Sequence, residues 1–231
     1  MSIESNINEI RDKIDKARIN GGRNDEVTLM AVTKMHEVSE ILESLNCGIT
    51  VIGENKAQEL LQKYPYIKDK CKIHFIGHLQ TNKVKAIIDK VDCIQSVDSL
   101  KLASEINKCA KSINKVMDVL IEVNIGDEDS KYGIDADDVS AFIDELSVFD
   151  NIKVRGLMCV LPIIASETEE KNILFERMWR IFIDNKEKKY DNISMDILSM
   201  GMSGDYECAI LHGANLVRVG TGIFGARNYN K

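Results

Sequence analysis

The stretch Val27-Thr-Leu-Met-Ala-Val-Thr33 decides the fold, and Lys34 follows it directly. Its apolar and β-branched residues do not alternate strictly with polar ones, which is typical of a strand buried on both faces of a parallel sheet. The residues before it, about 2–19, carry an amphipathic pattern that predicts a helix. The chain is therefore expected to begin with one helix and then enter a buried parallel sheet.

The same unit, a β-branched run followed by an amphipathic stretch, recurs along the whole chain. Further strands are expected at residues 49–53, 72–77, 92–96, 116–124, 152–160, 195–199 and 215–219. Helical patterns fill the gaps, for example at residues 99–111, 135–146 and 167–186. Roughly eight such units predict an α/β fold, a single (β/α)8 TIM-type barrel with an extra N-terminal helix. An open, doubly wound sheet is the alternative that the pattern alone leaves open.

Composition limits the class of protein. The 231 residues include only two prolines and no Ser/Gly/Pro-rich linker, so one domain over residues 1–231 is expected. Hydrophobic residues at 44% and charged residues at 29% are ordinary for a globular chain. The formal net charge of −7 argues against a general nucleic-acid surface, which needs clustered Lys and Arg.

The six cysteines are scattered, and none belongs to a C-x-x-C pair. Single thiols within apolar runs are typical of small buried side chains in a reducing compartment rather than of a disulfide framework. The N-terminus carries no apolar signal region, and no apolar stretch is long enough to span a bilayer. These features predict a cytoplasmic protein without a membrane partner.

Functional groups of a barrel lie at the carboxyl ends of its strands, where the βα loops form the mouth of the barrel. The first strand ends in Lys34, whose amine is expected to point into this mouth. Burial there disfavours the ammonium form and lowers the pKa of a lysine, as a Schiff-base amine requires. The alternative is a strand-end lysine that simply leaves the core for water.

Two glycine-rich loops follow the last two expected strands. They are Ser199-Met-Gly-Met-Ser-Gly-Asp205, which leads into a helix near Tyr206, and Arg218-Val-Gly-Thr-Gly222. Glycines let backbone N–H groups approach an anion, and the hydroxyls of Ser203 and Thr221 add donors. A phosphate site built from these two loops recurs in barrel enzymes. Ordinary glycine turns are the alternative, but together with Lys34 the loops favour a ligand that carries a phosphate and an aldehyde.

Arg218 lies two residues before Gly220, so both face the same side of the last strand. If Gly220 faces the ligand, Arg218 points into the barrel below it. A guanidinium beside a pyridine nitrogen donates a hydrogen bond and disfavours protonation of the ring, and an unprotonated ring is a poor electron sink. An ion pair inside the barrel is the alternative role for this arginine.

His74 and His78 flank Phe-Ile-Gly and raise the question of a metal pair. Four residues along a strand separate two side chains by roughly 13 Å, which is too far for one ion. His78 lies just past the expected strand end, so this separation is not fixed by the strand. No metal site is predicted.

The sequence resembles the pyridoxal phosphate homeostasis protein family, whose barrel is similar to the N-terminal domain of alanine racemase. The resemblance runs through nearly the whole chain. Its stretches are Ala31-Val-Thr-Lys34, Ile52-Gly-Glu-Asn-Lys-Ala-Gln-Glu59, His74-Phe-Ile-Gly-His-Leu-Gln-Thr-Asn-Lys83, Ser96-Val-Asp98, Val123-Asn124, Lys131-Tyr-Gly133, Gly156-Leu-Met158, Pro162, Leu198-Ser-Met-Gly-Met-Ser-Gly-Asp205 and Val217-Arg-Val-Gly-Thr-Gly-Ile-Phe-Gly-Ala-Arg227. Met35-His36 departs from the family, where many members carry a threonine or lysine and then proline.

The resemblance implies pyridoxal 5′-phosphate (PLP) as cofactor, bound as a Schiff base on Lys34. It places Asn55 near the ring hydroxyl and makes Arg218 the partner of the pyridine nitrogen. Around the phosphate it places Ser203, Gly204, Gly220 and Thr221. Met200 and Ile76 are expected to pack near the ring.

Three classes of function follow for such a barrel. A PLP carrier for cofactor homeostasis, without strong turnover, is expected, with PLP-dependent apoenzymes as candidate recipients. A PLP-dependent racemase or decarboxylase is the alternative, but these enzymes carry a second, β-rich domain, and only four residues follow Arg227. Racemisation also needs a second acid/base group, for which Tyr132 is a weak candidate. A barrel that has lost its ligand is disfavoured because Lys34 and the phosphate loops are present. Without a second domain, a monomer is expected.

Overall fold

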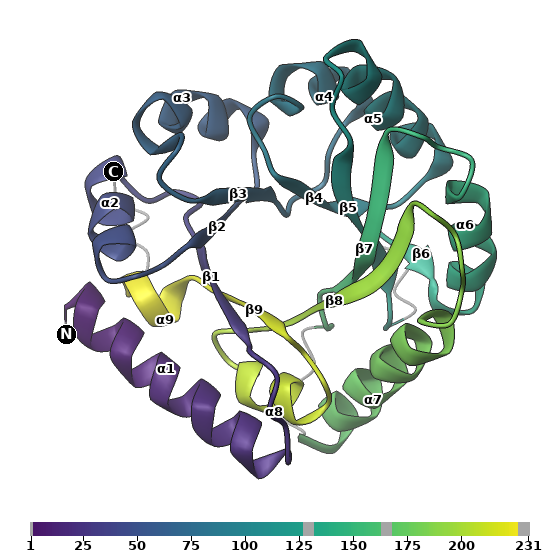
Figure 1. Ribbon diagram of the computed structural model, residues 1–231. Coiled ribbons are helices and arrows are strands. Elements are labelled where there is room, and N and C mark those ends of the chain that lie inside the picture. The colour runs from purple at the N-terminus through teal and green to yellow at the C-terminus, as the bar shows by residue number, and fades with distance from the viewer. Residues whose placement is uncertain (1, 127–131, 163–167, 226–231) are drawn as a thin grey trace.

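The computed structural model describes residues 2–126, 132–162 and 168–225. Eight parallel strands close into a barrel, and helices surround it (Figure 1). The strands of the barrel are β1 (Thr28–Val32), β2 (Val51–Glu54), β3 (Lys72–Phe75), β4 (Cys93–Val97), β5 (Met117–Asn124), β7 (Ile152–Cys159), β8 (Ile193–Met202) and β9 (Leu216–Val219). The pairing of β4 with β5 and of β1 with β9 completes the ring. The predicted (β/α)8 barrel is confirmed, and the open sheet is wrong.

Strand bounds differ from the prediction mainly in one place. β8 continues to Met202, three residues beyond the expected end, because its register against β9 shifts between Ser199 and Met202. A two-residue strand, β6 (Ile134–Asp135), was not expected and pairs with the end of β5. Lys131 and Arg227, which belong to two stretches of the family resemblance, lie outside the described residues.

Helices follow the strands as predicted. They are α2 (Val38–Asn46), α3 (Ala57–Ile67), α4 (Thr81–Ile87), α5 (Leu100–Ser112), α6 (Val139–Leu146), α7 (Thr168–Asn185), α8 (Tyr206–Leu211) and α9 (Thr221–Phe224). The helix expected from residue 135 starts instead with a 3-10 turn, Ala136–Asp138, before α6. Glu167, the first residue of the helix predicted at 167–186, lies outside the described residues. No helix within the described ranges has the length and apolar character needed to cross a bilayer.

The extra N-terminal helix, α1 (Ile3–Asn20), is present and packs against α8, α9 and α2 on the outside of the barrel (Figure 1). Ser2 is the N-cap of this helix, and its side chain accepts a hydrogen bond from the Ser5 N–H at 3.1 Å. Ile7, Ile10 and Ile14 are buried at a spacing of three or four residues, so one face of α1 joins the core. This packing covers the strands β1 and β9, whose ends carry two of the predicted site loops.

The core has an outer layer, between the strands and the helices, and a smaller inner layer inside the barrel. The inner layer consists of two apolar clusters, Met30 with Val51 and Leu216, and Cys93 with Leu120 and Met158. Alternation along a strand sends neighbouring side chains to opposite layers. On β5, for example, Leu120 belongs to the inner layer and Ile121 to the outer layer.

Candidate functional site

Lys34 lies in a tight turn at the end of β1, at the mouth of the barrel. Met30 belongs to the inner layer and Val32 adjoins Gly220, so the strand that leads to Lys34 turns these side chains toward the inside of the barrel. The His36 N–H donates to the Thr33 carbonyl at 3.2 Å and closes the turn. Met35 has a φ of 64°, a conformation that costs free energy in a non-glycine residue and must be held by its surroundings.

A buried polar network holds this turn from the outer layer. Lys63 of α3 donates from Nζ to the Thr33 carbonyl at 2.6 Å, to the Glu54 carboxylate at 2.9 Å and to the Glu59 carboxylate at 2.6 Å. The Thr33 hydroxyl donates to Glu54 at 2.6 Å, and the Met35 N–H donates to Glu59. Two of these hydrogen bonds end on the backbone on either side of Lys34. The network therefore fixes the position of the turn that carries the amine.

Charge balance within the network depends on Lys63. Glu54 has no exposed surface, and burial raises the pKa of its carboxyl while Lys63 and Thr33 act against that rise. Its Oε2 atom makes no hydrogen bond within the described part of the chain. Glu54 and Glu59 belong to the stretch of residues 52–59 that resembles the family, but the sequence alone predicts a role for neither. The spacing of Glu59 and Lys63, four residues along a helix, was the available signal.

Asn55 follows β2 and has a side-chain Oδ1 that is shielded from water and makes no hydrogen bond to any described residue. Gly77, just past β3, comes close to the Asn55 backbone, and a Cβ on this glycine would overlap the Asn55 carbonyl oxygen. Ile76 packs beside Gly53 against the inner cluster that contains Met30. Asn55 thus has an unused buried acceptor at the mouth, and Ile76 supplies an apolar side chain inside the barrel.

The two glycine-rich loops meet at Ser203. Its hydroxyl oxygen accepts hydrogen bonds from the Gly220 N–H at 3.3 Å and from the Gly222 N–H at 3.2 Å. Thr221, between these two glycines, is exposed, and a Cβ added to Gly204 would meet no atom within 4 Å. N–H and O–H donors from the ends of β8 and β9 are therefore gathered in one place, with open space beside them. Such a donor set suits an anionic oxygen.

Arg218 points into the barrel below Gly220, as predicted, and 3% of its surface is exposed. It donates from Nη1 to the Ser199 hydroxyl at 2.7 Å and from Nη2 to the Cys159 carbonyl at 2.7 Å. Both acceptors are neutral, so these contacts are not the ion pair that was its alternative role. Burial lowers the pKa of the guanidinium from its very high ordinary value.

The hydrogen bonds continue across the barrel from Arg218. Ser199 donates to Gln95 Oε1 at 2.8 Å, and the side-chain N–H of Gln95 faces His74 Nδ1 at 2.8 Å. This direction makes His74 Nδ1 an acceptor, and burial lowers the pKa of His74 to about 4, so its ring is neutral. This series of hydrogen bonds fixes the orientation of the Arg218 guanidinium. It also explains why polar side chains lie inside the barrel beside Arg218.

Met200 does not lie with the predicted site residues at the mouth of the barrel. Its side chain has no exposed surface and packs in the outer layer, whereas Ser199 before it points inward. The structure therefore does not place Met200 beside Ser203 and the inner face of the mouth.

His78 and Tyr132 form a stacked pair at the mouth, with ring centroids 3.7 Å apart and planes 12° apart. His78 Nδ1 lies 3.3 Å from the Asp98 carboxylate, and Tyr132 is exposed. His74 instead points into the inner layer, where it contacts Gln95. The two histidines thus have separate partners. Among the described residues, no group of three His, Cys, Asp or Glu side chains is placed to hold a metal ion.

Glu122 is a second functional candidate that sequence reasoning missed. It lies on β5 two residues beyond Leu120 and therefore on the inner side of the barrel. Burial, together with Asp98, raises the pKa of its carboxyl to about 7, and Arg218 acts in the opposite direction. A glutamate within a run of valine and isoleucine was the available signal.

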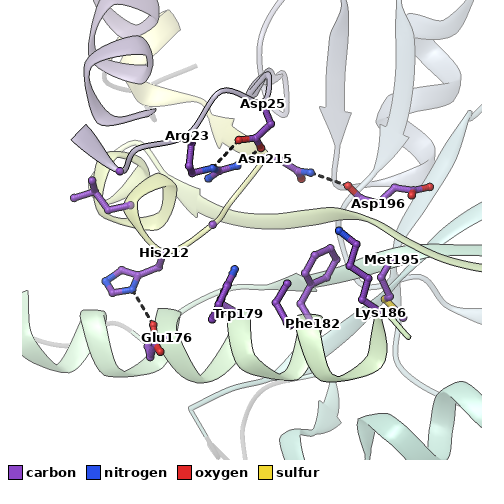
Figure 2. A pocket seen from close by; sticks show the side chains of 14 residues that line it. Arg23, Asp25, Glu176, Trp179, Phe182, Lys186, Met195, Asp196, His212 and Asn215 are labelled. Atoms are coloured by element: carbon purple, nitrogen blue, oxygen red, sulfur yellow. Dashed lines mark hydrogen bonds and ion pairs between the residues drawn. The ribbon is translucent and has the colours of Figure 1, made fainter. Parts of the chain in front are cut away.

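A hollow of about 570 Å³ lies elsewhere, between α7 and the loops that precede β1 and β9 (Figure 2). Trp179 and Phe182 of α7 line it, and His212 points to Glu176 across it. Arg23 pairs with Asp25 at its rim. This hollow is at the amino ends of the strands, and none of the eight predicted site residues lines it. The candidate site is the mouth at the opposite end.

The geometry of the mouth combines three kinds of group. Lys34 supplies an amine at the end of β1, Ser203 and its neighbouring N–H groups supply anion donors at the ends of β8 and β9, and Arg218 supplies a buried cation between them. β9 lies between β1 and β8 in the sheet, so these groups come from adjacent strands. The arrangement suits a ligand that carries both a phosphate and a carbonyl.

Comparisons with known proteins agree with this arrangement. The sequence profile of the family "Alanine racemase, N-terminal domain" matches residues 2–228. A pyridoxal phosphate homeostasis protein of Aquifex aeolicus is 41% identical over 225 residues, covering 96% of this chain and 97% of that protein. The protein of the same name from Escherichia coli K12 is 37% identical and covers 99% of this chain and 98% of its own length.

Solved structures include PipY of Synechococcus elongatus, determined without and with PLP bound. The form without PLP is 29% identical and superposes with a TM-score of 0.86 over 97% of this chain and 100% of that chain. Alanine racemase of Clostridium difficile, at 17% identity, shares the fold, with a TM-score of 0.71 and 57% of its chain covered. The profile match and the full-length relatives identify the chain as a member of the pyridoxal phosphate homeostasis protein family, built on the barrel of the alanine racemase N-terminal domain.

Proposed function

We propose that this chain holds PLP as a Schiff base on Lys34 and serves the intracellular homeostasis of this cofactor, without strong catalytic turnover. The observation that carries the proposal is the meeting of the two glycine-rich loops at Ser203, on strands adjacent to the one that ends in Lys34. Within the described residues the six cysteines form no disulfide, which supports a reducing, cytoplasmic compartment. Recipients of the cofactor are proposed to be PLP-dependent apoenzymes, and the carrier is proposed to act as a monomer.

The residues of the mouth fit PLP in kind and in position. Ser203 and the N–H groups of Gly220 and Gly222 would hold the phosphate, and Thr221 adds a hydroxyl beside them. The unused Oδ1 of Asn55 is an acceptor for the ring hydroxyl. Arg218 would donate to the ring nitrogen, and Lys34 would bond the aldehyde carbon. When bound in enzymes, PLP supplies an electron sink that stabilises carbanions. This capacity falls when the ring nitrogen stays unprotonated.

Phosphate contacts are expected to dominate the affinity. A charge-assisted hydrogen bond contributes about 1.5–3 kcal/mol, so Ser203→Ala and Thr221→Val are each expected to weaken PLP binding roughly tenfold or more. Pyridoxal, which lacks the phosphate, is expected to bind far more weakly than PLP. Equilibrium titration measures both effects. Ser140→Ala, an exposed serine on α6, is the matched control and should leave the affinity unchanged. Equal affinities for pyridoxal and PLP would remove the role assigned to these loops.

Amino-acid turnover is expected to be negligible. Arg218 is held by two hydrogen bonds and is a donor only, so it cannot stabilise a protonated ring nitrogen. Racemisation of alanine and decarboxylation of ornithine or lysine by the PLP-loaded protein should remain far below about 1 s⁻¹, the lower end of ordinary enzyme rates. Chiral chromatography and carbon dioxide release measure the two reactions. Turnover above that rate, lost in Lys34→Ala, would make the chain an enzyme and this part of the proposal wrong.

A further inference from the structure

Glu122 occupies a defined place on the inner wall of the barrel. On β5 it pairs with Met158 of β7, and Met158 belongs to the inner layer together with Leu120. On the other side, β4 pairs with β5 through Val97 and Ile121, which puts Asp98 level with Glu122 at the mouth. The carboxyl of Glu122 therefore stands above the apolar inner cluster, toward the end of the barrel at which Lys34 and Ser203 follow their strands.

The carboxyl of Glu122 has unused hydrogen-bonding capacity. Its Oε2 is shielded from water and makes no hydrogen bond with any residue of the described ranges. A buried polar atom without a partner costs about 1–3 kcal/mol, and more when the group is charged. A proton or a ligand atom reduces this cost. Asn55 Oδ1, at the end of β2, is another acceptor at the mouth in the same state.

Charged groups around Glu122 oppose one another. Asp98 raises its pKa, and this aspartate has His78 at 3.3 Å, itself covered by the Tyr132 ring. Arg218 on β9, which lies deeper in the barrel, lowers the pKa of Glu122. Met158, its partner on β7, is uncharged, and His74 on β3 is a neutral ring deeper in the barrel. Among the described residues, Asp98 and Arg218 thus act on Glu122 in opposite directions, and burial, the largest cause, raises the pKa of its carboxyl to about 7.

We propose that Glu122 is a ligand-contacting residue of the mouth, and that an anionic phosphorylated pyridine ligand binds together with a proton on its carboxyl. This inference rests on the proposed function. A phosphate dianion in the mouth adds negative charge, which disfavours an ionised carboxylate nearby. The protonated carboxyl offers a donor to an oxygen of the ligand, whereas the ionised one offers only acceptors. Affinity for the ligand should therefore fall as pH rises through the range in which Glu122 of the free protein ionises.

Pyridoxine 5′-phosphate is the suitable probe because it has no aldehyde, so the amine of Lys34 takes no covalent part. The wild-type protein, Glu122→Gln and Glu145→Gln are titrated with it between pH 6 and pH 9. Glu145 is an exposed acid on α6, and its substitution removes the same charge without touching the mouth. Above about pH 7, the affinity of the wild type and of Glu145→Gln should fall more steeply than that of Glu122→Gln. The additional loss should be up to about tenfold for each pH unit.

Calorimetry in two buffers of different ionisation enthalpy adds a direct readout. At pH 8 the wild type should take up close to one proton on binding the probe, and Glu122→Gln should take up none beyond the ligand's own contribution. Asp98→Asn removes the neighbouring charge, so the midpoint of the pH dependence should move to a lower pH; this variant serves where Glu122→Gln does not fold. If all of these proteins bind the probe and their affinities change with pH in the same way, the inference is overturned but the proposed function is not. Failure of the wild type to bind either PLP or the probe would instead contradict the proposed function.

Discussion

Borohydride treatment of the PLP-loaded protein should fix one pyridoxyl group on Lys34, and Lys34→Ala should abolish both this label and the visible absorbance of the bound cofactor. Reduction converts the Schiff base to a stable amine, so mass spectrometry of the tryptic peptide locates the modified lysine. The effect is all-or-none because alanine offers no nucleophile at the end of β1. No other substitution in the chain is expected to change the bound state as completely.

Lys56→Ala is the matched control for this experiment. Lys56 is exposed and follows Asn55, so it lies close to the same end of the barrel but outside the turn that the network of Lys63 holds. Its removal should leave the label on Lys34 unchanged. A label found chiefly on another lysine, with Lys34 unmodified, would contradict the central proposal. Retained phosphate-dependent binding in Lys34→Ala, without the label, would show that the loops at Ser203 act independently of the amine.

The sequence was sufficient to predict the barrel for a physical reason. Parallel strands that are buried on both faces need continuous apolar runs, and such runs stand out against the amphipathic helices between them. The run at 116–124 therefore predicted β5 almost to the residue. β8 was predicted too short because Gly201 interrupts the apolar run after Ser199, and pairing with a shifted register carries the strand on to Met202. The two residues of β6 have no pattern of their own and form only because β5 offers a free edge there.

The site was predictable where position along the chain determines it. Lys34, Ser203 and Gly220 follow strands, and the carboxyl ends of parallel strands always meet at one end of a barrel. Met200 was placed by family resemblance alone, and alternation after Ser199 turns its side chain to the outer layer. Glu122 lies within a strand rather than after one, so reading the strand ends did not find it.

Lys63 could not be assigned from sequence because its function depends on three separate segments. The end of β1, the end of β2 and the first turn of α3 each contribute one acceptor, and only the folded chain brings them together. A lysine within an amphipathic helix is normally exposed, yet 6% of Lys63 is exposed here. The contacts made by its ammonium group lead to the second large effect that we expect.

Lys63→Met should lower the free energy of unfolding by about 3–5 kcal/mol, because removing one partner of a buried pair leaves the other charge uncompensated. Methionine keeps the approximate length and apolar stem of the side chain, so lost packing contributes little. The thermal midpoint should fall by roughly 6–20 °C, taking about 2–4 °C per kcal/mol for a chain of this size. Urea titration and thermal melting of the protein without ligand measure the two quantities. Lys186→Met, an exposed lysine near the end of α7, is the control and should change neither.

The dependence of this loss on pH identifies its cause. Without Lys63 the pKa of the Glu54 carboxyl in the folded state rises further above its value in the unfolded chain. A carboxyl with a raised folded pKa destabilises the protein increasingly as pH rises from the unfolded to the folded value. The difference between Lys63→Met and the wild type should therefore be small near pH 4 and largest at pH 7 and above. Adding Glu54→Gln to Lys63→Met should recover much of the loss at neutral pH, since the buried charge is then gone. A loss that is constant with pH and unchanged in the double variant would mean that Lys63 stabilises the turn through its hydrogen bond to Thr33 and not through its charge.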